Sequence, residues 1–228
     1  MLVTVIVPCF NEIETIEIIL NRIAQRDDHT KEVIVIDDGS TDGTRELLVN
    51  HLKSTPLVDN LILHEKNQGK GAAICSGIAH AKGEIIIIQD ADLEYDPIDY
   101  KKLLNPIIRG EADVVFGSRF SGGELSRVLY FWHRVGNGIL TLLSNVFTNL
   151  NLTDMECGYK AFSKEVLQKI EITRKGFDCE PEIVSKVAKL KPRIYQVGVS
   201  YYGRTYEDGK KITWRDGLKA VYVILKFR

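Results

Sequence analysis

The stretch Ile85-Ile86-Ile87-Ile88-Gln89-Asp90-Ala91-Asp92-Leu93-Glu94 decides the fold of this chain. Four β-branched residues in a row predict a buried strand, of the kind that parallel sheets cover on both faces. Two acids, Asp90 and Asp92, follow where this strand would end. Because open α/β sheets bind ligands beyond the carboxyl ends of their strands, these acids would stand at a binding edge. Carboxylate oxygens there suit a hard divalent cation, although a solvated acidic turn fits the spacing equally well.

Strand and helix patterns alternate on either side of this stretch. Apolar runs that predict strands lie at 3–8, 33–37, 59–64, 84–89 and 113–117. Helical patterns separate them, at 12–26, 42–53, 70–81 and 97–109, and later patterns predict helices at 163–170, 179–190 and 213–227 and a strand at 193–202. This order is typical of an α/β fold with a mostly parallel sheet and helices on both faces. Since no low-complexity linker interrupts the 228 residues, we expect a single domain, 1–228.

A long helical pattern with a broad apolar stripe follows Gly122-Gly123. The stripe comprises Val128, Phe131, Val135, Ile139, Leu142, Val146 and Leu150, and is broadened by Trp132, Leu140, Leu143 and Phe147. Such a stripe most often packs against the core, which is our prediction; contact with a membrane surface is the alternative. Arg127 and Arg134 flank it. The uncharged segment 135–153 is too rich in Gly, Asn, Ser and Thr to predict a membrane span.

Charge is unevenly distributed along the chain. Residues 1–158 carry 14 Lys and Arg against 23 Asp and Glu, whereas residues 159–228 carry 16 against 8. The basic segment would suit an anionic partner or simply contain solvated helices. The four cysteines are scattered without a disulfide framework, and a strand-like run follows Met1 directly, so we expect a cytoplasmic protein without a signal peptide.

Polar residues also follow the other predicted strands. The first strand runs into Pro8-Cys9-Phe10-Asn11-Glu12, the second into Asp37-Asp38-Gly39-Ser40, and the third precedes Asn67-Gln68-Gly69-Lys70-Gly71 at the start of a helix. All of these segments should meet the edge that carries Asp90. An aspartate there could accept hydrogen bonds from a nucleobase or ribose, the neighbouring side chains could cap helices, and Lys70 beside free N–H groups could meet a phosphate.

These motifs, together with Gly117-Ser118-Arg119-Phe120, resemble the family 2 inverting glycosyltransferases of the GT-A fold. Two later segments, Thr153–Phe162 and Tyr202-Gly203-Arg204 with Gly209-Lys210-Lys211, resemble the polyprenyl-phosphate branch of that family, which includes dolichyl-phosphate mannose and glucose synthases. The resemblance covers about residues 3–215. It implies a nucleotide-sugar-binding half at 1–120 and an acceptor-binding half at 121–228.

The resemblance also implies roles for individual residues. Nucleotide-sugar binding falls to Pro8, Phe10, Asn11, Glu12, Asp37, Asp38, Lys70, Asp90 and Ala91. Mg²⁺ or Mn²⁺ would be held by Asp90, Asp92 and Glu94, although several relatives have Gln at the last position. The catalytic residues implied are Asp92, Asp154 and Arg119, and the acceptor phosphate would meet Arg127, Arg134, Arg204, Lys210 and Lys211. A salt-bridged surface arginine is the structural alternative for Arg119, and a turn cap is the alternative for Asp154.

The expected reaction moves a hexose from GDP-mannose or UDP-glucose to a polyprenyl phosphate. A lipid phosphate is already an oxyanion and needs positioning by cations, whereas a saccharide hydroxyl would need a general base, for which Asp154 or Glu156 is the candidate. We expect no nucleic-acid partner. Because Arg228 follows an apolar run too short to span a bilayer, a lipid acceptor would require peripheral membrane contact or a membrane partner protein.

Two other classes of protein compete with this interpretation. A non-catalytic nucleotide-sugar-binding subunit would keep the donor residues without turnover. A dinucleotide-dependent dehydrogenase is disfavoured, since the first βα turn, Pro8 to Asn11, contains no glycine.

Overall fold

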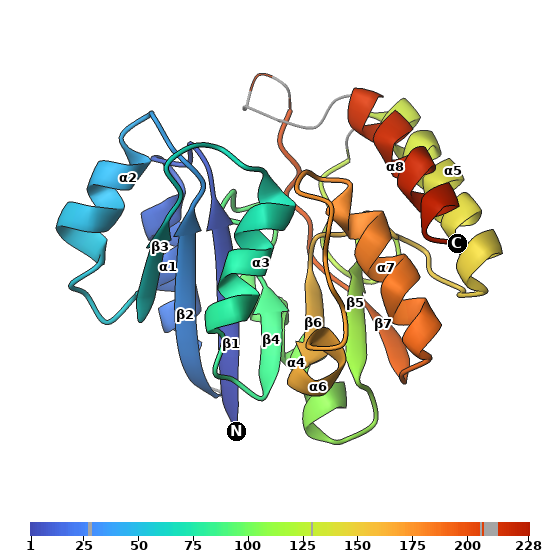
Figure 1. Cartoon of the computed structure of the whole chain (residues 1–228), viewed down its shortest axis with the longest axis horizontal. Coiled ribbons are helices and arrows are strands. Elements are labelled where there is room, and N and C mark those ends of the chain that lie inside the picture. The colour runs from blue at the N-terminus through green and yellow to red at the C-terminus, as the bar shows by residue number, and fades with distance from the viewer. Residues whose placement is uncertain (27–28, 129, 206, 208–213) are drawn as a thin grey trace.

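The computed structural model describes residues 1–26, 29–128, 130–205, 207 and 214–228. Within this described part, a single sheet has the strand order β3-β2-β1-β4-β6-β5-β7 (Figure 1). Its strands are β1 (Leu2–Cys9), β2 (Thr30–Asp37), β3 (Asn60–Leu63), β4 (Ile85–Ile88), β5 (Val114–Ser118), β6 (Lys160–Ser163) and β7 (Ile194–Gly198). The helices are α1 (Ile16–Ala24), α2 (Thr44–Leu47), α3 (Lys70–His80), α4 (Tyr100–Ile108), α5 (Phe131–Thr148), α6 (Lys164–Leu167), α7 (Cys179–Leu190) and α8 (Trp214–Lys226). A π-helical turn (Leu48–Leu52) continues α2, and a 3₁₀ turn (Pro97–Asp99) precedes α4.

The parallel strands bring the polar segments to one edge. Strand β1 pairs with β2 from Leu2↔Thr30 to Cys9↔Asp37, and with β4 as far as Ile6↔Ile88. Since the three strands run in the same direction, the residues that follow each of them meet at their carboxyl ends. The segments after Cys9, Asp37 and Ile88 are therefore neighbours, as their positions along the strands predict.

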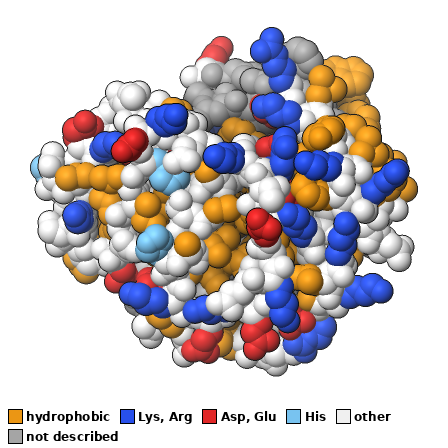
Figure 2. All heavy atoms as spheres, in the orientation of Figure 1, with side chains coloured by type: hydrophobic (Ala, Val, Ile, Leu, Met, Phe, Trp, Pro, Cys, Tyr) orange, Lys and Arg blue, Asp and Glu red, His pale blue; other side chains and the backbone are white. Residues whose placement is uncertain are grey.

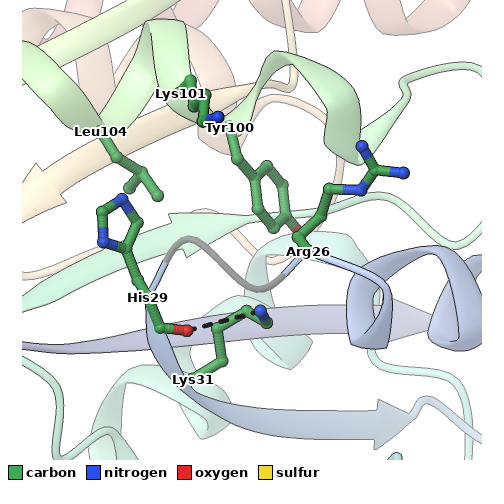
Figure 3. Close-up of a pocket in the computed structure, with 6 residues that line it drawn as sticks. All are labelled: Arg26, His29, Lys31, Tyr100, Lys101 and Leu104. Atoms are coloured by element: carbon green, nitrogen blue, oxygen red, sulfur yellow. Dashed lines mark hydrogen bonds between the residues drawn. The ribbon is translucent and has the colours of Figure 1, made fainter.

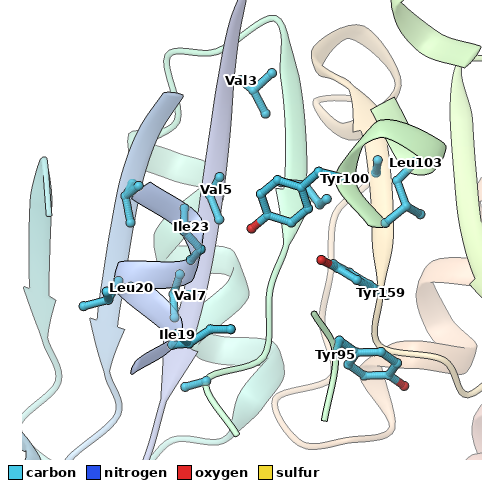
Figure 4. Close-up of a cluster of buried hydrophobic side chains, with 14 of the residues drawn as sticks. Val3, Val5, Val7, Ile19, Leu20, Ile23, Tyr95, Tyr100, Leu103 and Tyr159 are labelled. Carbon is cyan, nitrogen blue, oxygen red and sulfur yellow. The ribbon is translucent and has the colours of Figure 1, made fainter. Parts of the chain in front are cut away.

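Side chains of each central strand alternate between two cores. Ile85 and Ile87 belong to the cluster that includes the buried residues of α1 and α4, whereas Ile86 and Ile88 belong to the cluster that includes those of α3 and α7. Figure 4 shows the first cluster, where Val3, Val5 and Val7 of β1 face Ile19, Leu20 and Ile23 of α1. This arrangement confirms the predicted α/β fold with helices on both faces of a mostly parallel sheet.

Strand β6 was not predicted. It lies antiparallel between β4 and β5, with Ile87↔Ala161 and Val115↔Ala161 as paired positions. The segment is only four residues long and begins with a lysine, so neither alternation nor an apolar run reveals it. Lys160 is nevertheless 1% exposed. The predicted helix at 163–170 is correspondingly shortened to α6.

The apolar stripe of α5 lies largely in solvent, so the prediction that it packs against the core is wrong for half of it. Val128 before the helix is 95% exposed and Trp132 is 76% exposed. Further exposed members of the stripe are Phe131, Ile139, Leu142 and Val146. The flank formed by Leu140, Leu143, Phe147 and Leu150 does pack partly against the second core cluster. Periodicity identified the residues that share a face but not which face points inward.

Helix length and polarity also bear on membrane contact. In the part of the chain that the structure describes, no helix combines the length and apolar character needed to cross a bilayer.

Candidate active site

Asp90, the first of the two acids after β4, is paired with a lysine. The Lys70 Nζ atom lies 2.7 Å from Asp90 Oδ1. Lys70 is the first residue of α3, so its side chain starts at the same sheet edge. On its other side, Lys70 Nζ lies 3.1 Å from Oε1 of Glu180, a buried acid of α7. Sequence reasoning missed Glu180, because an acid in the first turn of a helix is ordinary.

Asp92 and Glu94 face a loop from the far end of the chain. Arg204 Nη2 lies 3.3 Å from Asp92 Oδ2 and 2.9 Å from Glu12 Oε1. Glu94 accepts hydrogen bonds from the Arg204 backbone N–H at 2.7 Å and from the Tyr201 hydroxyl at 3.1 Å. The structure thus brings Glu12, Asp92, Glu94, Arg204 and Tyr201 together. Arg204, predicted to meet the acceptor phosphate, lies beside acids predicted to hold the metal.

The chemistry of these acids fits a divalent cation. Burial, followed by the charges of Asp90 and Glu94, raises the pKa of Asp92 to about 7, against the opposing effect of Arg204. A cation would relieve that repulsion. Among the described residues no group of three or more acids, histidines or cysteines is arranged to hold a metal by itself. Mg²⁺ commonly needs just one or two carboxylates, with substrate phosphates and water completing its shell. The metal role of Asp90 and Asp92 stays a prediction.

Asp38 shapes the loop before α3. Its Oδ1 atom lies 2.6 Å from His64 Nδ1 and accepts from the Gln68 N–H at 2.9 Å, while its Oδ2 atom accepts from the Gly69 N–H at 2.7 Å. His64 in turn lies 2.9 Å from the Ser76 hydroxyl. The aspartate therefore links β2, β3 and α3. Its contact with a nucleoside stays a prediction.

The other residues predicted to bind the nucleotide sugar lie at the same edge. Asp37 is buried and accepts a hydrogen bond from Arg45 Nε at 2.6 Å. In this structure it therefore holds the Arg45 side chain. Asn11 adopts φ 51° and its side-chain carbonyl accepts from the Thr41 N–H at 2.8 Å. Ala91 is buried, whereas Pro8 and Phe10 at the end of β1 are half-buried.

Arg119 and Asp154, both predicted to be catalytic, are paired with each other. Arg119 Nε and Nη2 donate to the two Asp154 oxygens at 2.7 and 2.8 Å, and the Arg119 backbone N–H donates at 3.0 Å. Asp154 is 1% exposed. The pair joins the end of β5 to the segment before β6, so the geometry itself supplies a structural role. Their catalytic role stays a prediction.

Glu156 is the acid near this pair with spare hydrogen-bonding capacity. Its buried Oε1 atom has no hydrogen-bond partner in the described structure. Burial and then the charge of Glu180 raise its pKa to about 7, although Lys160 and Arg119 oppose the shift. A carboxyl group that titrates near neutrality is suited to proton transfer.

The predicted acceptor-phosphate residues are spread over several elements. Arg127 Nη1 donates to the Gly203 carbonyl at 3.1 Å, and Arg134 of α5 lies 3.5 Å from the centroid of the Phe120 ring. Arg204 lies at the sheet edge, beside Glu12 and Asp92. Lys210 and Lys211 lie outside the described residues.

A small pocket elsewhere is unrelated to this edge. It is lined by Arg26, His29, Lys31, Tyr100, Lys101 and Leu104 (Figure 3). It lies by the start of β2, whereas the acids follow the ends of the strands. Its cavity of about 10 Å³ has room for about one water molecule. It is therefore too small for a nucleotide.

Comparison with protein families and curated proteins indicates the chemistry. The model of Glycosyl transferase family 2 matches residues 4–171. The chain is 28% identical over 232 residues to a dolichol-phosphate mannosyltransferase from Pyrococcus furiosus, covering 100% of this chain and 64% of that protein. It is 29% identical over 223 residues to an undecaprenyl-phosphate mannosyltransferase from Micrococcus luteus, covering 92% of this chain and 87% of that protein. The chain thus spans less than two thirds of the Pyrococcus protein.

A solved structure resembles the whole described fold. Glucosyl-3-phosphoglycerate synthase from Mycobacterium tuberculosis, crystallised with Mn²⁺, UDP and glucosyl-3-phosphoglycerate, superposes with a TM-score of 0.76. The match covers 99% of this chain and 79% of that chain at 21% sequence identity. At that identity the likeness establishes the shared fold, and it confirms the expected GT-A architecture.

Proposed function

This chain belongs to glycosyl transferase family 2, and we propose that it transfers a hexose from a nucleoside diphosphate sugar to a polyprenyl phosphate. The observation that carries this proposal is the sheet edge where Asp90 and Asp92 meet Lys70 and Arg204. Two acid–cation pairs lie there, Lys70 with Asp90 at 2.7 Å and Arg204 with Asp92 at 3.3 Å. Such an edge can hold a diphosphate through the positively charged side chains of Lys70 and Arg204 and through a bound metal.

The donor side follows from the charge that develops on the leaving group. When the bond to the sugar breaks, the nucleoside diphosphate gains negative charge, and groups aimed at that charge lower the barrier. Mg²⁺ or Mn²⁺ at Asp90 and Asp92 would supply Lewis-acid neutralisation. Lys70 and Arg204 would bind and orient the diphosphate. Asp38 and Glu12 would position the nucleoside.

The acceptor side is supported by charge and by the relatives. Two relatives are named for transfer to lipid phosphates, dolichol phosphate and undecaprenyl phosphate. A phosphate oxyanion needs no general base, which agrees with an Asp154 whose oxygens are both engaged by Arg119. Residues 159–228 carry the excess of Lys and Arg that an anionic acceptor requires.

Membrane contact through α5 and α8 is part of this proposal. The outer sides of these helices expose Phe131, Trp132, Leu142, Leu218 and Tyr222. Figure 2 shows hydrophobic side chains gathered at the upper right, where Figure 1 places these two helices, with Lys and Arg beside them. An amphipathic surface of this kind can lie in the headgroup region of a membrane. The enzyme would then work at the cytoplasmic membrane face, where a lipid acceptor would be within reach.

A saccharide hydroxyl is the second candidate acceptor. It would need a general base, and Glu156 suits that role better than Asp154, because its Oε1 atom has no hydrogen-bond partner and its pKa is raised to about 7. In that case Glu156→Gln would abolish transfer. With a phosphate acceptor the same variant should retain most of its activity.

Radiolabelled transfer assays test the proposal. GDP-mannose and UDP-glucose are each offered with undecaprenyl or dolichyl phosphate, with and without Mn²⁺. We expect metal-dependent formation of a labelled lipid from one of the donors. Labelled product on a saccharide alone would establish the second candidate. Donor binding without turnover on any acceptor would instead indicate a non-catalytic subunit.

A further inference from the structure

We propose that Glu180 is a positioning residue that holds the Lys70 ammonium group at the donor diphosphate. The inference rests on the proposed function, because it assumes that Lys70 meets a nucleoside diphosphate. It concerns a residue of α7 that lies 110 positions after Lys70 in the chain. None of the motifs at the sheet edge includes it.

Lys70 is held from two sides. Its Nζ atom lies 2.7 Å from Asp90 Oδ1 and 3.1 Å from Glu180 Oε1. Glu180 Oε1 has no hydrogen-bond partner, so its contact with the lysine is an ion pair. Glu180 is 3% exposed, which keeps water from screening this pair.

Glu180 is itself fixed by a second lysine. Its Oε2 atom accepts a hydrogen bond from Lys160 of β6, which also donates to the Cys157 carbonyl. Lys160 therefore leaves the other carboxylate oxygen of Glu180 directed to Lys70. The row Lys160, Glu180, Lys70, Asp90 alternates in charge and connects β6 to the sheet edge.

The backbone closes one side of this row. A Cβ atom at Gly158 would lie 2.5 Å from Asp90 Oδ2 and 2.9 Å from Lys70 Nζ. The chain thus passes directly against the ion pair, and a side chain at this position would displace it. Lys70 has little room to move on that side.

If Asp90 held a divalent cation, Lys70 would need Glu180 as its remaining carboxylate partner. The cation would repel the neighbouring ammonium group, since like charges a few ångströms apart interact strongly in a buried site. Glu180 lies within ion-pair distance of the Lys70 ammonium group. It would keep this group at the sheet edge when Asp90 binds the cation. Lys70 then remains available for the diphosphate. Without Glu180 the ammonium would lose its second carboxylate.

A double-mutant cycle on nucleotide binding tests this inference. Calorimetry measures the affinity of Mn²⁺ with UDP, and of Mn²⁺ with GDP, for the wild type, Lys70→Met, Glu180→Gln and the double variant. We expect each single variant to weaken binding roughly tenfold, the effect of losing one buried charged contact. We expect the double variant to bind no more weakly than Lys70→Met, because Glu180 acts through Lys70.

Glu182→Gln is the matched control. Glu182 is a fully buried acid on the same helix, and its partners among the described residues are Thr173, Arg174 and Lys186, not Lys70. Its loss should lower the melting temperature and leave nucleotide affinity unchanged. If Glu180→Gln does not fold, Glu180→Asp enters the same cycle, since it keeps the charge and shortens the reach.

The outcomes separate the two proposals. If the effects of Lys70→Met and Glu180→Gln multiply in the double variant, Glu180 supports the fold alone and this inference is overturned, while the proposed donor class stands. If the wild type binds neither nucleotide with Mn²⁺, the proposed donor class is wrong and the inference falls with it.

Discussion

Helices α1 and α5 bury opposite kinds of residue. Helix α1 buries Ile16, Ile19, Leu20 and Ile23 against the sheet. Helix α5 fully buries Thr141 and Ser144, and it leaves large apolar side chains such as Phe131 and Trp132 in solvent. The core under α1 is thus closed within the chain, by residues from both halves of the sequence. The later half presents an apolar surface that gains stability when something else covers it.

The size of this surface makes the difference significant. Burying one large apolar side chain contributes about 1.5–3 kcal/mol, and contiguous exposed patches usually mark interaction sites. The charged side chains at the sheet edge that carries Asp90 and Asp92, by contrast, have partners within the chain. We therefore expect substitutions in the two regions to affect different measurements.

The largest effect should follow a change at the sheet edge that carries Asp90 and Asp92. Asp92→Asn should lower lipid transfer by about a thousandfold, because it removes charge that binds the cation and stabilises the leaving group. Labelled-lipid formation measures this. Vesicle binding should stay unchanged, and Glu111→Gln, which alters an exposed acid, is the control. Loss of vesicle binding in Asp92→Asn would show that the two regions are not independent.

Next in size is the buried pair that joins β5 to the segment before β6. Asp154→Asn should cost about 3 kcal/mol of unfolding free energy, because it leaves the Arg119 charge buried without its partner. Urea unfolding measures this loss. Arg193→Met, which breaks the exposed pair with Asp113, should shift the midpoint far less. Equal shifts would mean that Arg119 reaches solvent when its partner is removed.

A smaller effect should follow a change on α5. Replacing Phe131 and Trp132 by aspartate should weaken sedimentation with anionic vesicles by roughly tenfold or more, since it removes two apolar anchors. Nucleotide affinity should stay at the wild-type value. Ile18→Asp is the matched control, because Ile18 is a 45% exposed apolar residue on α1. Full vesicle binding by the α5 variant would exclude this helix as the membrane contact.

The last effect concerns the pH dependence of unfolding. Glu156 has a folded-state pKa raised to about 7 from 4.5, so the folded protein binds a proton that the unfolded chain releases between these values. Its contribution to stability is therefore present at low pH and is lost as the pH rises through about 7. Comparison of urea unfolding at pH 5 and pH 8 should show this loss, of at most about 3 kcal/mol. Glu156→Gln should reduce the difference in unfolding free energy between pH 5 and pH 8. An unchanged difference in this variant would exclude Glu156 as its source.

Local pattern predicted the parts of the fold where neighbours in sequence decide the environment. The run Ile85–Ile88 is apolar throughout, and it is buried on both faces. The positions of Asp90 and Asp92 followed from the rule that parallel strands end at one edge. Both inferences needed no knowledge of distant contacts.

The features that sequence reasoning missed depend on partners far along the chain. Lys160 can lie in a central strand because Glu180 balances its charge. No residue close to Lys160 in the sequence predicts that contact. The stripe of α5 predicted a shared face, but its orientation depends on packing against α7 and α8. Glu180 itself resembles any acid at a helix start until Lys70 is placed beside it.

The position of β6 has a consequence for synthesis of the chain. Translation proceeds from the N-terminus, and β4 and β5 leave the ribosome well before residues 160–163. Until then, an edge of β4 and an edge of β5 have no strand to pair with. Unpaired edges are sites of aggregation. The nascent chain therefore carries these two unpaired edges from the completion of β5 until β6 arrives, and a chaperone would protect it in that interval.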